Sequence, residues 1–388
     1  MLYKFGLEAF NGAIVTLATN RYDQDAYLSG TPSRTFEKIG LLSGLNQVFQ
    51  CVGSVLIAPL IKQWPTRTVL SGSIFVLIFA AILLVVDAAT GGHIKPANFT
   101  PAHKNDFSYY GHYNTDWIIP IYCVTGVAYG MVELIRRVIP RDIVGGDPEK
   151  LQRMDALVHI FYEVSGTAGA FATALGLIPR LEWSQIIVGG SNFGELLGAF
   201  SVFLLANYVK TPIPWLRLDA IMLLIIWYIP YYYPSVGEVK CAWIIAATFI
   251  PISFGWAAGD VSLAAYIQTL LGRLESKDKE VSPLGAVMAF LYSSYIIIYA
   301  IANPLLGKYI DSVYNSTGSV RPALVNTAAV QLTVISVMVF ISTMIPKGAI
   351  ACNPKLDDDQ AVENAETIDA VPNSTPPKYS ISDTVVHV

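Results

Sequence analysis

Residues 136–169 read RRVIPRDIVGGDPEKLQRMDALVHIFYEVSGTAG. A basic segment and a Gly/Pro turn lead into an apolar segment that carries Asp155, His159 and Glu163 at intervals of four residues. In an α-helix this spacing places the three side chains within roughly 80° of one another, on one face. Titratable groups in such a row are typical of a solvated surface in a soluble protein, whereas inside a membrane they indicate a functional site.

The composition of the chain decides between these two settings. Hydrophobic residues make up 53% of the 388 residues and charged residues 14%, whereas soluble domains carry about 25% charged residues. Aromatic residues reach 12%, which fits aromatic belts at two membrane interfaces. The net charge of −4 arises in the tail, since residues 353–388 hold seven acids and two bases. The composition therefore predicts a membrane protein in contact with the lipid bilayer, and no nucleic-acid partner.

Ten apolar stretches approach the length of about 20 residues with which a helix crosses a bilayer. We predict an all-α, multi-pass membrane protein without strands, because lipid-exposed segments satisfy their backbone polar groups within helices. An N-terminal half, residues 1–181, contains five spans. A C-terminal half, residues 182–350, contains the other five, and residues 351–388 form a disordered, acidic, cytosolic tail. The predicted spans are 2–18, 39–61, 69–89, 117–135, 155–178, 186–209, 213–232, 242–271, 285–306 and 324–345.

Basic residues set the predicted orientation of these spans. Five of them lie between residues 136 and 153, and positive charge favours the cytosolic side of a membrane. When this loop and the N-terminus are inside, the sequons at Asn98 and Asn315 lie outside, where N-glycosylation takes place.

Two parts of the chain resemble each other. Residues 44–46 (GLN) and 190–192 (GSN) each open a stretch that leads through tryptophan and proline to an arginine and a new span. Further along, the Gly-x-x-x-Gly motif at 126–130 resembles the one at 255–259. Spans two to five therefore match spans six to nine, and parallel repeats of this kind are typical of secondary transporters.

The segment between spans two and three, residues 58–67 (APLIKQWPTR), resembles the G-P-L-x-D-R-x-G-R-R loop of the major facilitator superfamily. Lys62 stands where the family has aspartate, and Arg67 matches the final basic residue. Together with YKFGLEAFNGAIVTLATNRYD at residues 3–23 and the segment from residue 136 onward, this pattern looks like a fungal branch of that superfamily.

The resemblance has implications for the helix count and for the site. Superfamily members have twelve helices as six plus six, whereas the chain supplies ten predicted spans, and the repeats leave family helices six and seven without a counterpart. The resemblance also implies that spans one, four and eight line a central cavity. The candidate cavity residues are Glu8, Asn11, Glu133, Trp256 and Asp260, and the candidate gating residues are Lys62, Arg67, Arg136 and Arg137.

The row on the fifth span is the candidate proton pathway. His159 lies roughly 6 Å and Glu163 roughly 12 Å deeper along the helix than Asp155. Histidine titrates near neutrality and a carboxylate exchanges protons readily, so the row suits a proton-coupled transporter. The alternative is structural: Asp155 pairs with a nearby arginine, and the other two side chains hydrogen-bond neighbouring helices. Glu133 is expected to pair with Arg136 or Arg137.

Other motifs bear on enzymatic activity and partners. The chain has no P-loop, GxSxG, HExxH or CxxC motif, and its four cysteines have no paired spacing. We therefore expect no cofactor, no metal and no enzymatic activity. In the tail, Pro376, Pro377 and Tyr379 form a PPxY motif of the kind that WW domains bind. In fungi this resemblance would imply recruitment of a WW-domain ubiquitin ligase.

These observations predict a secondary active transporter that carries a small-molecule substrate by alternating access, coupled to protons. The plasma membrane is preferred to the vacuole as its location. Two alternatives remain open at this point. One is a non-transporting or truncated transporter-like protein, such as a sensor or remnant, because two family helices are missing. The other is a membrane-embedded enzyme that uses the Asp/His/Glu face.

Overall fold

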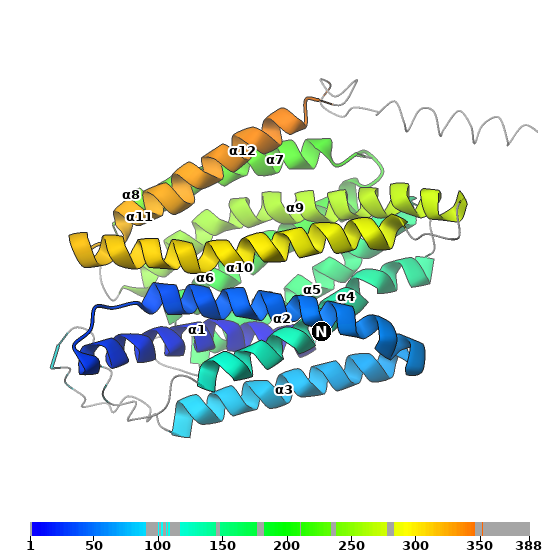
Figure 1. The fold of residues 1–388 in the computed structure, drawn as a ribbon. Coiled ribbons are helices and arrows are strands. Elements are labelled where there is room, and N and C mark those ends of the chain that lie inside the picture. Colours follow the sequence, from blue (N-terminus) through cyan, green and yellow to red (C-terminus); the bar gives the residue numbers. More distant parts are fainter. Residues whose placement is uncertain are drawn as a thin grey trace, which may run out of the picture.

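The computed structural model describes residues 2–90, 117–144, 148–176, 182–209, 211–233, 238–277 and 283–345, with isolated positions between 100 and 108 and at 351. Long helices lie side by side in these segments, with α3 and α12 at opposite edges of the bundle (Figure 1). The described segments contain no strand. The long helices are α1 (Leu2–Ser29), α2 (Thr35–Gln63), α3 (Thr66–Thr90), α4 (Ile118–Val144), α5 (Pro148–Gly176), α6 (Glu182–Leu205), α9 (Val239–Lys277) and α10 (Pro283–Thr317).

Two further rods are composed of shorter pieces. The first joins α7 (Ile213–Leu223), the 3-10 turn η3 (Leu224–Trp227) and α8 (Tyr228–Tyr231). The second joins α11 (Arg321–Leu324), the π-helical segment η4 (Val325–Val330) and α12 (Gln331–Ser342). Most of each predicted span thus lies in a helix or in a run of helices, and residues 177–178 of the fifth span lie outside the described residues.

The prediction of a helical membrane protein is confirmed. Within the described residues, seven helical segments are long and apolar enough to cross a membrane, and the prediction of ten crossings is not settled by this finding. The remaining predicted spans correspond to α1, α3 and α5. The seven segments are Thr35–Ile57, Ile118–Arg136, Ser184–Leu205, Ile213–Tyr231, Val239–Gln268, Ser294–Thr317 and Arg321–Ser342.

Several helices extend beyond the predicted spans. The basic segment at 136–153 was expected to be a loop, but α4 continues to Val144 and α5 begins at Pro148. The prediction of a loop was therefore wrong. The physical reason is that arginine, lysine and glutamate favour helix and that proline is well suited to the first turn of a helix. α9, with 39 residues, is about 58 Å long and exceeds a hydrocarbon core of about 30 Å.

The helices pack in two equivalent sets. In the first half α2 and α3 both contact α4, and in the second half α6 and α7 both contact α9. Across the division between the halves, α5 contacts α6 and α10 contacts α2. Exchanging the two halves therefore reproduces these contacts, in agreement with the internal repeat in the sequence, although the contacts of α1 with α5 and of α5 with α9 have no equivalent of similar extent among the described helices.

Glycines allow the closest of these contacts. A Cβ atom at Gly130 of α4 would overlap the Gln50 carbonyl of α2, and one at Gly194 of α6 would overlap the Ile250 carbonyl of α9. Small residues of this kind are typical of helix interfaces in membranes. The repeated motifs differ in their packing, however, because Gly126 and Gly130 face α2 whereas Gly255 faces Asp219 of α7.

The chain connections gather at two ends of the bundle. At one end, here called the Asn315 end, the amide of Asn315 donates a hydrogen bond of 3.2 Å to the carbonyl of Ser33. The rings of Tyr27 and His103 stack there with centroids 3.6 Å apart. At the other end, here called the Arg217 end, Arg217 donates a hydrogen bond of 2.9 Å to the carbonyl of Ala351. Successive described helices run in alternate directions between these two ends (Figure 1).

Close packing at Gly130 makes the α2–α4 interface sensitive to a single methyl group. We expect Gly130→Ala to destabilise the protein by about 1–3 kcal/mol, because the added atom overlaps backbone that has no room to move. Gly72→Ala in α3 is the matched control, since a Cβ there has no neighbour within 4 Å. Thermal unfolding in detergent measures both, and equal stability of the two variants would contradict the described interface.

The arrangement of the ends predicts which positions share a side of the membrane. In a background whose four cysteines are replaced by serine, Ser33→Cys and Asn315→Cys should react with an impermeant maleimide from the same side. Arg67→Cys, at the start of α3, should react from the opposite side. Labelling of the first two positions from opposite sides would contradict the bundle, and labelling of both from the cytosol would reverse the predicted orientation.

Candidate functional site

The first turns of α1 bring a buried ion pair into the bundle. Lys4 and Glu8 are 7% and 9% exposed, and their charged atoms are 2.5 Å apart. They lie at i and i+4, so the helix itself places them on one face. The Lys4 ammonium also lies 4.3 Å from the centre of the Tyr162 ring of α5, where the ring face attracts a cation.

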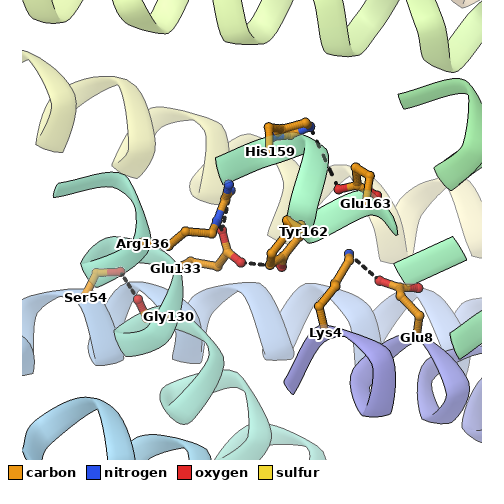
Figure 2. Close-up of polar contacts among 9 residues, drawn as sticks. All are labelled: Lys4, Glu8, Ser54, Gly130, Glu133, Arg136, His159, Tyr162 and Glu163. Carbon is orange, nitrogen blue, oxygen red and sulfur yellow. Dashed lines mark hydrogen bonds and ion pairs between the residues drawn. The ribbon is translucent and has the colours of Figure 1, made fainter. Parts of the chain in front are cut away.

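A second ion pair comes from α4 and is joined to the same tyrosine. Arg136 donates two hydrogen bonds of 2.9 and 3.1 Å to one carboxylate oxygen of Glu133. The hydroxyl of Tyr162 donates a hydrogen bond of 2.5 Å to the other oxygen. The guanidinium lies 4.4 Å from the centre of the Tyr162 ring, and Figure 2 shows Glu133 between Arg136 and Tyr162. The expected contact between Glu133 and Arg136 is therefore present, while its role as a gate stays a prediction.

A third group lies where α5 meets α6. The Nε2 atom of His159 is 3.8 Å from a carboxylate oxygen of Glu163, which is only 1% exposed (Figure 2). Glu195 of α6 faces them, and one potential ligand atom from each of the three residues lies within 4.8 Å of the others. The three are called the His–Glu–Glu cluster below. Its third member is Glu195 of another helix, whereas the sequence suggested Asp155 of the same helix.

Gly166 lets three helices meet beside this cluster. A Cβ atom at Gly166 of α5 would lie 2.9 Å from Cε of Lys4 and 3.0 Å from Nδ2 of Asn192. Lys4 belongs to α1 and Asn192 to α6, so the absence of a side chain in α5 brings both towards one another. The two ion pairs and the His–Glu–Glu cluster consequently form one continuous polar region within α1, α4, α5 and α6.

The charges of this region are unbalanced when every group is ionised. With His159 neutral, two cations, Lys4 and Arg136, face the four carboxylates of Glu8, Glu133, Glu163 and Glu195, which leaves two negative charges in excess, and a protonated His159 would leave one. Both cations are already engaged, one with Glu8 and the other with Glu133. Buried charge without compensation is costly, so the remaining two carboxylates require protons or a bound cation. The arrangement is therefore suited to taking up and releasing positive charge.

Other predicted residues lie outside this region. Trp256 is 57% exposed on α9, and Asp260, which interacts electrostatically with Glu195, is also exposed. Arg67 is exposed at the start of α3. Asn11, Lys62 and Arg137 belong to helices, but their side chains lie outside what the structure describes, as do residues Asn98, Pro376, Pro377 and Tyr379 altogether.

Sequence reasoning did not assign a role to three members of the polar region. Lys4 stood near the start of the chain, but its i,i+4 spacing from Glu8 was a signal for an ion pair within the first span. Neither Glu195 nor Tyr162 belongs to a motif or a spacing that marks a functional residue. No sequence signal joined Glu195 to His159, because the two residues belong to different helices.

Known proteins provide no assignment for these residues. Comparisons of the chain with family models, with curated proteins and with solved structures find no match. The chemistry of the polar region is therefore argued from its own geometry.

Burial makes the Lys4–Glu8 pair a stability determinant. We expect Lys4→Met to cost about 3–5 kcal/mol, because it leaves a buried carboxylate without its cation. The double variant Lys4→Met/Glu8→Gln should recover most of this loss. Arg34→Ala, which removes the exposed partner of Glu37, should change stability little. Denaturant unfolding in detergent tests all three, and equal losses in the single and double variants would contradict a buried ion pair.

Proposed function

We propose that this protein is a secondary active transporter that moves a small solute by alternating access and couples the movement to protons. The observation that carries the proposal is the position of the His–Glu–Glu cluster at the contact between α5 and α6. These helices belong to the two halves that the internal repeat defines. In transporters built from repeats, the halves rock against one another around a site between them.

The packing of the halves supports this mechanism. The halves are joined by two equivalent contacts, one between α5 and α6 and the other between α10 and α2. Such a paired arrangement permits one end to open as the other closes. We also propose that the chain is a ten-helix relative of the major facilitator superfamily. In it, α2, α3, α4 and α5 of the first half are equivalent to α6, α7, α9 and α10 of the second half.

The contact between α10 and α2 includes a carboxylate that caps a helix at the Asn315 end. Asp311 of α10 accepts hydrogen bonds of 3.2 and 2.7 Å from the backbone N–H groups of Phe36 and Glu37, in the first turn of α2. These N–H groups have no partner within their own helix, and a carboxylate there stabilises the helix end. Each of these bonds joins one half to the other, so their making and breaking is suited to an outer gate.

Proton coupling follows from the excess of negative charge. Protonation of Glu163 or Glu195 removes charge from the contact between α5 and α6, and deprotonation restores it. Because the two halves meet at this point, the charge state biases their separation. His159, within 3.8 Å of Glu163, is placed to pass a proton to it.

One observation favours the alternative of a protein that no longer transports. α1 covers α5, but among the described helices no counterpart of α1 covers α10 in the second half. Phe290, Ile298 and Leu305 of α10 are exposed. A transporter-like sensor or remnant that lacks one cavity-lining helix fits this asymmetry, and direct measurement of solute movement separates it from a transporter.

The transport proposal predicts a specific loss in Glu163→Gln. In proteoliposomes with an inward proton gradient, the wild-type protein should accumulate a solute from a labelled library of small metabolites. Glu163→Gln should reduce this uptake by about tenfold or more, because a proton-transfer group is lost. It should keep solute counterflow, which needs no net proton movement. Asp106→Asn, in an exposed loop, is the control and should transport normally.

Three outcomes bear on this prediction. Unchanged proton-driven uptake in Glu163→Gln would contradict the proton pathway. Loss of both uptake and counterflow would indicate a structural role for Glu163 and not a coupling role. Absence of any flux through the wild-type protein, across the library and in both directions of the gradient, would favour the sensor or remnant.

A further inference from the structure

We infer that His159, Glu163 and Glu195 form a binding site for one divalent transition-metal ion. Each side chain offers one ligand atom, and the three atoms lie within 4.8 Å of one another. They come from neighbouring helices, α5 and α6, which are held in contact along their length. The inference stands whether or not the protein is a transporter, since a site of this kind also exists in proteins that hold a metal ion in place.

The donor atoms indicate the class of ion. One imidazole nitrogen and two carboxylate oxygens suit divalent first-row ions such as Mn²⁺, Fe²⁺, Co²⁺ and Zn²⁺. Ca²⁺ and Mg²⁺ prefer sites composed of oxygen ligands alone, and Cu⁺ prefers sulfur. The mixed set therefore selects a transition metal in its divalent state.

A second observation points to a ligand at this position. Glu163 is only 1% exposed, yet its Oε2 atom has no hydrogen-bond partner among the described residues. Asn192 lies one turn before Glu195 on α6, is 6% exposed, and its Nδ2 atom is likewise without a described partner. Buried polar groups normally have partners, so these two atoms require an explanation.

Asn192 lies on the same face of α6 as Glu195, three residues earlier. Its Nδ2 atom lies 3.0 Å from the Cβ position of Gly166, which is also close to Cε of Lys4 and Cγ of Glu8. The ligand set that the distances support is therefore His159, Glu163 and Glu195.

Electrostatics favour the same ion. The ammonium of Lys4 is held by Glu8 at 2.5 Å and also interacts electrostatically with Glu163 and Glu195, so this one cation serves three carboxylates. A divalent cation would balance both carboxylates at once, while His159 binds it as a neutral imidazole. Binding would displace protons from the carboxylates, so affinity should fall as pH falls.

Binding would draw the three ligand atoms together. With metal–ligand bonds of about 2.1 Å, the ligands of a tetrahedral ion lie about 3.4 Å from one another. The three ligand atoms now lie within 4.8 Å of one another, and Nε2 of His159 lies 3.8 Å from a carboxylate oxygen of Glu163. Rotation about side-chain torsions is the movement that would close the remaining difference.

The inference is tested by metal binding to the full-length protein in detergent, purified without a histidine tag and stripped with a chelator. Titration with Co²⁺ should give visible absorption bands that saturate at one ion per chain, and Mn²⁺ should compete. His159→Gln, Glu163→Gln and Glu195→Gln should each weaken binding by about tenfold or more. His103→Gln and Glu37→Gln, which remove similar groups elsewhere, should bind as the wild-type protein does.

Glu195→Cys separates a ligand from a residue that only supports the fold. A thiolate at this position should add a sulfur-to-cobalt charge-transfer band and shift preference from Mn²⁺ towards Cd²⁺. Thermal unfolding identifies variants that fail to fold. Absence of saturable binding to the wild-type protein, or unchanged binding and spectra in folded Glu195→Gln and Glu195→Cys, would overturn the inference. Loss of binding in His103→Gln would place the metal elsewhere and would also overturn it.

Discussion

Charged side chains lie inside a bundle whose helices are largely apolar, and their mutual compensation constrains how α1, α4, α5 and α6 pack. Lys4 is held by Glu8, and Arg136 by Glu133. Tyr162 joins the two pairs, since its ring lies beside both cations and its hydroxyl binds Glu133. Both ion pairs lie within single helices, so a displacement of α1 or α4 would keep each pair intact but would break its contacts with Tyr162 of α5.

Close helix contacts make this compensation geometrically possible. Gly130 brings α4 against the backbone of α2, and Gly166 leaves room for Lys4 and Asn192 between helices. A side chain at either position would separate elements whose polar groups must remain within hydrogen-bond distance. Packing and electrostatics therefore act on the same contacts, and small residues are needed where charged ones meet.

The two halves of the bundle share several equivalent contacts but differ in their chemistry. α5 and α10 each cross to the other half, yet the His–Glu–Glu cluster occurs at the contact of α5 with α6, and Asp311 occurs at the contact of α10 with α2. Uptake of protons or cations at the α5–α6 contact and helix capping at the α10–α2 contact would stabilise different arrangements of the two halves by different amounts. Proton coupling and metal binding are two readings of one feature, an excess of buried negative charge, and both are open to direct measurement.

Much of this protein is determined by local sequence. Apolar stretches predicted helices and a membrane setting, and the i, i+4, i+8 spacing placed Asp155, His159 and Glu163 on one face, because these properties depend on residues that are close in the chain. The same spacing would have revealed the Lys4–Glu8 pair. The ends of α4 and α5 were misplaced, since charged residues end a span in lipid without ending a helix.

The tertiary structure alone decided which groups share a site. Glu195 joins His159 and Glu163 from another helix, so the absence of a metal motif in the sequence had no bearing on a site assembled in space. Trp256 and Asp260 are exposed on α9, and their place in a cavity stays a prediction. The covalent chain fixes which side chains share a helix face, whereas the partner of that face depends on how all the helices pack together.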